Sequence, residues 1–295
     1  MTPKRLWTTK FKEFDIVVAQ TGEAAFKARA MDSHRNAVAD ADANDPHEAQ
    51  ARVLEEVRPY TAEFFGFDEA VNIFRKPFPD GFDDAYYEYR ERGYKRRSHE
   101  RALEVLNRED VTRLWQAGAC NEIVQRVKTA YQAPAGNLLA PLEHAKLNDA
   151  LKNERTRGEA ARVIGEHLHA DPPRFVERFA AVMRPHGAGT WPVATYLPFL
   201  LMPDSQMFLK PSVTQLFADR VGYDFTYDAR PNVETYRDLL GLAALTVEAL
   251  QVRSCPPNDR IDVQSFIWSI GHEGYVQDAV ADRDRKGFGS QRGDA

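Results

Sequence analysis

A short basic stretch gives the clearest sign of chemistry in this chain. Residues 90–101 read RERGYKRRSHER and hold six Lys or Arg side chains against two Glu. On a helix, residues three, four and seven positions apart share one face, and this spacing gathers four side chains that could contact phosphate groups. They are Arg92, Lys95, Arg96 and His99. Tyrosines are interleaved with these side chains, and proteins hold nucleic acid with such combinations of aromatic and basic residues. The alternative is a solvated helix face whose arginines pair with nearby carboxylates.

A second group of polar side chains lies among large apolar residues between positions 191 and 268. A buried polar group without a partner costs about 1–3 kcal/mol, so these side chains must be hydrogen-bonded if they are buried. If these side chains meet in one cleft, they form a site for an anionic small molecule. If each one caps a separate helix, their role is structural. The group consists of Lys210, Thr214, Arg230, Asp262 and Gln264.

Two members of this polar group have specific alternatives. Lys210 is expected at the start of a helix, where a positive charge opposes the helix dipole. It could bind an anion, act as a base with a lowered pKa, or pair with Asp204 or Asp262. Asp262 is expected to be the N-cap of a helix. A metal-dependent nuclease pattern fails, because Phe208 stands where an acid would have to precede the lysine.

No metal, cofactor or membrane segment is expected. His167 and His169 are two positions apart, so they face different sides of a helix and cannot chelate one ion there. Cys120 and Cys255 have no metal spacing, which predicts free thiols and a cytoplasmic protein. The chain has no P-loop and no nucleophile elbow. No stretch approaches the ~20 apolar residues that span a bilayer.

Composition and periodicity predict a mainly α protein, a compact multi-helix assembly with little or no sheet. The net charge of −5 is evenly spread, with 22 Lys+Arg against 25 Asp+Glu in residues 1–150 and 17 against 19 in residues 151–295. Any nucleic-acid surface would therefore be a local patch. Strand-like patterns are few, chiefly residues 14–19. We expect an N-terminal helical region at 1–185, a C-terminal helical region at 186–276, which could continue the first, and a disordered tail at 277–295.

Four segments of the chain resemble a family of bacterial proteins to which no activity is assigned. They match the patterns WPxxT, FLKPxVT, RPNxxTY and IDVQSFIW at residues 191–195, 208–214, 230–236 and 261–268. The likeness covers about residues 60–275. The order of these segments also looks like helical modules that accompany bacterial restriction-type proteins, which favours nucleic acid as a partner.

Three functions follow as hypotheses. The first is a nucleic-acid-associated binding or accessory protein without its own catalytic centre, which contacts its partner through residues 90–101. The second is an enzyme with a buried polar site around Lys210, Arg230, Asp262 and Gln264. The third is a helical scaffold that binds another protein. The sequence leaves open whether the chain catalyses any reaction.

Overall fold

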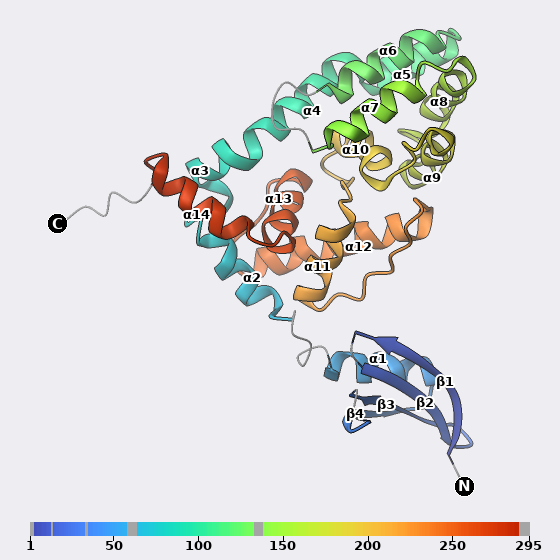
Figure 1. Ribbon diagram of the computed structural model, residues 1–295, viewed down its shortest axis with the longest axis vertical. Helices are drawn as coiled ribbons and strands as arrows, with labels where there is room; N and C mark the ends of the chain where they lie inside the picture. The colour runs from blue at the N-terminus through green and yellow to red at the C-terminus, as the bar shows by residue number, and fades with distance from the viewer. Residues whose placement is uncertain (1–2, 13, 33–34, 58–63, 133–137, 289–295) are drawn as a thin grey trace, which may run out of the picture. The chain divides into compact units, whose positions relative to one another are not determined.

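The computed structural model describes residues 3–12, 14–32, 35–57, 64–132 and 138–288 (Figure 1). The chain divides into two compact units. The first comprises Met1–Gly66 with Asp219–Gly222, and the second comprises Phe67–Ala218 with Tyr223–Ala295. This division does not coincide with the one expected at residue 185, because the helices on both sides of that position pack against each other in the second unit.

The first unit is a four-stranded antiparallel sheet with one helix. The strands follow the chain order: β1 (Lys4–Phe11), β2 (Phe14–Gly22), β3 (Ala25–Met31) and β4 (Ala37–Ala43). Helix α1 (Pro46–Val57) covers β2, β3 and β4, and its buried Val53 and Val57 join a core that includes Ile16 and Val18. Apolar residues alternate along β2, as a strand covered on one face requires.

The expectation of little or no sheet is therefore wrong for this unit, while the mainly α class holds for the chain as a whole. Only β2 places large apolar residues at alternate, buried positions. β1 is mostly polar and exposed, and β4 has the sequence AVADADA, a composition that is equally typical of an exposed helix end or a loop. Pairing with neighbouring strands outweighs the weak local preference of Ala and Asp for strands.

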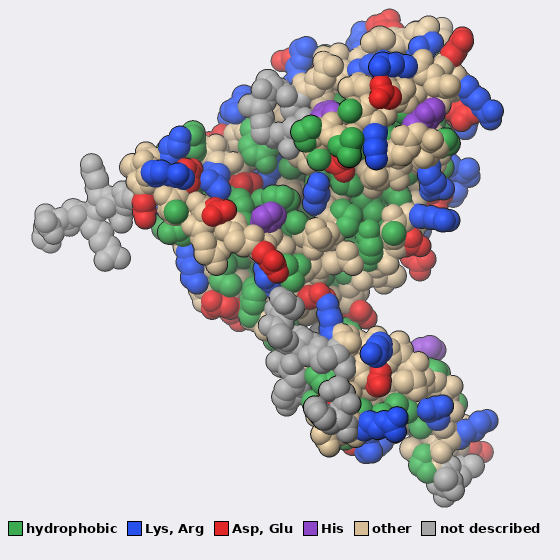
Figure 2. All heavy atoms as spheres, in the orientation of Figure 1, with side chains coloured by type: hydrophobic (Ala, Val, Ile, Leu, Met, Phe, Trp, Pro, Cys, Tyr) green, Lys and Arg blue, Asp and Glu red, His purple; other side chains and the backbone are tan. Residues whose placement is uncertain are grey.

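The second unit is built from helices. In chain order they are α2 (Gly66–Arg75), η2 (Gly81–Asp83), α3 (Ala85–Tyr87), η3 (Glu88–Arg92), α4 (Gly93–Leu106), α5 (Arg108–Gln116), α6 (Cys120–Tyr131), α7 (Pro141–Ala150), α8 (Glu154–His167), α9 (Pro172–Met183), η4 (Arg184–His186), α10 (Trp191–Leu201), α11 (Pro211–Val221), α12 (Val233–Val252), α13 (Arg260–Gly271) and α14 (Tyr275–Arg285). On the face drawn in Figure 2, cations and carboxylates are interspersed over these helices.

Helix α13 is the central element of the second unit. It contacts α12, α14 and η3, and ten of its residues are buried. Its Phe266 packs edge-on against Phe74 of α2 and Phe217 of α11. A buried helix in this position brings the polar side chains of Asp262, Gln264, Ser265 and Ser269 into the core.

The segment η3 is one turn of π-helix between α3 and α4. Gly93 follows it as the first residue of α4, and an added Cβ there would lie 2.7 Å from the carbonyl oxygen of Glu88. Only glycine fits this close approach of the backbone without a shift. Turns of this type occur often at functional sites, and this one carries Arg92.

The C-terminal end differs from the expected tail. Residues 277–285 belong to α14, whose inner side buries Tyr275, Val276 and Ala279. The polar composition of the segment hides this stripe, because tertiary contacts rather than local preference hold the helix. Residues 289–295 lie outside the described residues. None of the helices in the described part of the chain is long and apolar enough to span a membrane.

Candidate functional site

The predicted phosphate-binding stripe does not form one solvent-facing row. The side chain of Arg92 is 16% exposed and bridges Asp259, at 2.7 Å, and Asp262. Lys95 is 1% exposed, and its Nζ donates to Glu91 at 2.7 Å and to Ser265 at 2.8 Å. Two of the four side chains therefore point into the core and are already paired.

The other two members of the stripe stay nearer the surface. Arg96 is exposed and pairs with Glu88 and Glu100, each at 3.1 Å. The Nδ1 atom of His99 lies 2.5 Å from the carbonyl oxygen of Leu200, which makes Nδ1 the protonated nitrogen. The paired arginine matches the solvated-face alternative, so the stripe offers phosphate groups less charge than its sequence indicates.

Asp262 is the centre of a buried polar network and is not the N-cap of α13. That role belongs to Asp259, whose Oδ1 accepts from the backbone N–H of Ile261 at 2.8 Å. Asp262 is fully buried and accepts hydrogen bonds from Tyr87 at 2.6 Å, from Arg92, and from the backbone and side-chain nitrogens of Asn258 at 2.8 and 2.9 Å. The partners from α3 and η3 lie about 170 positions away, so local spacing could not reveal them.

The same network contains a lysine beside a serine hydroxyl. Such a pair can activate a nucleophile when a substrate reaches it. Here Ser265 is 0% and Lys95 is 1% exposed. The hydroxyl donates to the carbonyl oxygen of Ile261, and Glu91 also accepts from Tyr275. Burial lowers the pKa of Lys95, and the neighbouring Glu91 opposes that shift. We therefore interpret the pair as a structural contact.

The remaining members of the predicted polar group do not converge. Lys210 lies 3.8 Å from Glu143 and not beside Asp204 or Asp262. Thr214 is buried, and Arg230 is exposed in the turn before α12. Gln264 is 3% exposed, and its Oε1 has no hydrogen-bond partner among the described residues. The structure thus joins Arg92, Lys95 and Asp262 in one network and places Lys210 and Arg230 elsewhere.

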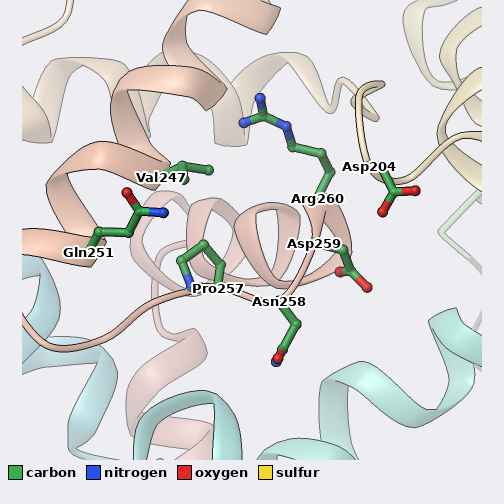
Figure 3. A pocket seen from close by; sticks show the side chains of 7 residues that line it. All are labelled: Asp204, Val247, Gln251, Pro257, Asn258, Asp259 and Arg260. Carbon is green, nitrogen blue, oxygen red and sulfur yellow. The ribbon is translucent and has the colours of Figure 1, made fainter.

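A pocket of about 260 Å³ opens beside this network, at the start of α13 (Figure 3). Three segments form it: the turn after α10, the C-terminal half of α12, and the residues that lead into α13. Its lining combines two carboxylates, two amides, a guanidinium and two apolar side chains, from Asp204, Asp259, Asn258, Gln251, Arg260, Val247 and Pro257.

Two opposite charges in the pocket lack a partner within the described chain. Arg260 is half-buried, its Nη1 is buried without a hydrogen bond, and burial lowers the pKa of its guanidinium. Asp204 is exposed and takes part in no ion pair there. Both side chains line the pocket, and Figure 3 shows them pointing in different directions. Because neither charge is paired with a described residue, both are available to a ligand.

The wall of the pocket is fixed by the buried network. Asp259 binds Arg92, Asn258 binds Asp262, and the backbone N–H of Arg260 donates to Pro203 at 2.7 Å. These contacts hold both the turn after α10 and the start of α13. The three segments that form the pocket carry no shared sequence pattern, although one signal points to it. Arg260 stands at the first position of a helix, where the dipole disfavours a cation, as it does for Lys210.

A comparison of the chain with known protein families, with curated proteins and with solved structures finds no match. The resemblance to a bacterial family therefore stays a prediction.

Proposed function

We propose that the second unit binds a small zwitterionic molecule in the pocket lined by Asp204 and Arg260. The observation that carries this proposal is a pair of opposite charges on one pocket, neither of which has a partner among the described residues. An anionic group on the ligand would offset the unfavourable burial of the guanidinium. An ammonium group would satisfy Asp204 in the same way. The proposal concerns binding and assigns no reaction.

The size and the other lining residues restrict the ligand. Pockets for drug-sized molecules usually enclose roughly 300–1,000 Å³, so a pocket of about 260 Å³ favours a molecule of amino-acid size. The amides of Gln251 and Asn258 offer hydrogen bonds to it. Val247 and Pro257 provide a short apolar surface. A free amino acid with a small polar or aliphatic side chain meets these conditions.

The test is a thermal-shift screen of the full chain with free amino acids, followed by calorimetry on each one that stabilises it. A ligand at 100 times its Kd adds about 2.7 kcal/mol of stability, which corresponds to roughly 5–10 °C in Tm for a unit of this size. We expect Arg260→Gln and Asp204→Asn each to weaken binding at least tenfold. The matched control is Arg230→Gln, which removes an exposed arginine outside the pocket. Absence of any stabilising amino acid, or unchanged affinity in both pocket variants, would overturn the proposal.

One observation favours the nucleic-acid hypothesis as a second candidate. Tyr89 is 54% exposed, and the Nζ of Lys286 lies 5.7 Å from the centre of its ring. An exposed ring beside a cation can stack on a base. We expect binding of single-stranded DNA or RNA at this ring to weaken as salt rises and to be lost in Tyr89→Ala. No binding at low salt would exclude this candidate.

A further inference from the structure

The two outer strands of the first unit carry opposite charges. β1 bears three exposed cations and no acid, and β4 bears two aspartates and no cation. The cations are Lys4, Arg5 and Lys10, and the aspartates are Asp40 and Asp42. Within the described part of this unit each strand pairs with one neighbour only, so one edge of each is open to a further strand.

We propose that β1 of one copy pairs with β4 of a second copy and continues the sheet from molecule to molecule. Three successive antiparallel pairings make β1 and β4 run in opposite directions. A second copy placed beside the first in the same orientation therefore presents its β1 antiparallel to β4. The two strands have matching lengths of 8 and 7 residues.

The strand registers show which residues of the two edges share a face. Thr8 pairs with Val17, Val17 with Arg29, and Arg29 with Asp40, so Thr8 and Asp40 lie on the face opposite α1. Lys10 and Asp42 have the same parity and lie on that open face too. On the helix-covered face β1 contributes Trp7 and Thr9, and β4 contributes Ala39, Ala41 and Ala43 beside Val38.

One register satisfies both faces. If Lys10 stands opposite Asp40, then Trp7 and Phe11 stand opposite Ala43 and Ala39, which pairs large side chains with small ones. Asp42 lies diagonally across from Lys10 and is 69% exposed. Asp40 and Asp42 also contact Arg29 and Lys27 of their own sheet, and each carboxylate retains room to accept from a second cation.

The charges also select the orientation of the assembly. Two β1 edges would bring together rows of like charge, which destabilises direct cross-strand pairs. The favoured contact is therefore head to tail, and such contacts generate chains or rings rather than closed two-fold dimers. Arg52 of α1 donates to the carbonyl oxygen of Asp42 at 3.0 Å and limits pairing at that end of β4.

Sedimentation velocity on the full chain over a range of concentrations tests this proposal. We expect association at low salt and at least a tenfold weaker association in Lys10→Asp and in Asp42→Lys. Each variant keeps one native edge, and the two substituted edges carry opposite charges again, so a mixture of the two should recover association. Circular dichroism checks the fold of each variant. The matched control Glu56→Lys reverses an exposed charge on α1 and should associate as the wild type does. A wild type that stays monomeric at every concentration, or association that both variants retain, would overturn the proposal.

Discussion

Replacing Asp262 by Asn tests whether the buried network stabilises the second unit through its charge. The carboxylate is fully buried and accepts four hydrogen bonds, two of them from Asn258. Asn has the same shape, but its amide nitrogen would face donors wherever it is placed. Removing one partner of a buried ion pair costs about 3–5 kcal/mol. Since Arg92 keeps its contact with Asp259, we expect the free energy of unfolding to fall by about 3 kcal/mol, the lower end of this range.

Urea unfolding followed by tryptophan fluorescence measures this loss. Three of the four tryptophans, at 115, 191 and 268, lie in the second unit, so the signal reports mainly on that unit. We expect the urea concentration at the midpoint of unfolding to fall, while the dependence of the unfolding free energy on urea concentration stays unchanged. The matched control is Asp204→Asn, an exposed carboxylate that forms no ion pair with the residues that the structure describes, and this variant should stay within about 0.5 kcal/mol of the wild type. An Asp262→Asn variant within about 1 kcal/mol of the wild type would refute the role that we give to the charge.

Three further predictions concern single residues. Gly93→Ala should lower the free energy of unfolding in urea by about 1–3 kcal/mol, because the new Cβ would meet a backbone carbonyl. The control Gly158→Ala, which has open space around it on α8, should raise that free energy by up to about 1 kcal/mol. Burial raises the pKa of the Cys255 thiol, so alkylation of the folded protein should label Cys120 first and Cys255 only after unfolding, and equal labelling would contradict this burial. Burial and the hydrogen bond to Asp282 raise the pKa of Tyr86 to about 12. The folded state therefore holds this proton more tightly than the unfolded state, and stability should fall as pH rises from about 10 to 12, less steeply in Tyr86→Phe.

The sequence was informative about local structure and much less so about pairing. Apolar residues recur at helical spacing over 83–106 and 172–184, and the structure has helices over both segments. β4 was missed, since an Ala/Asp alternation has no strong preference of its own. Asp262 was correctly placed near the start of a helix but given the role of its neighbour Asp259.

The candidate site was predictable only in part, for the same reason. The side chains of Arg92, Lys95 and Asp262 were selected by residue type, and the structure brings them together. Their partners lie on segments far along the chain, so the sequence could not distinguish a basic surface from a neutralised interior. The pocket depends on the turn after α10 meeting the start of α13. Such a meeting is a property of tertiary packing and leaves no local pattern.

The π turn at 88–92 determines how the buried network is assembled. Tyr87 and Arg92 are five positions apart, and both donate to the same oxygen of Asp262. In a regular α-helix two such residues point about 140° apart, because each residue turns the helix by 100°. A hydrogen-bonding pattern five residues long brings them onto the same side instead. The turn thus acts as a one-residue insertion that sets the rotational phase between α3 and α4. Deleting one residue within it would restore a continuous α-helix in which the tyrosine and the arginine are four positions apart and still share a face. The network should therefore tolerate this deletion, whereas forcing the five-residue spacing into regular α-helix would separate the two donors.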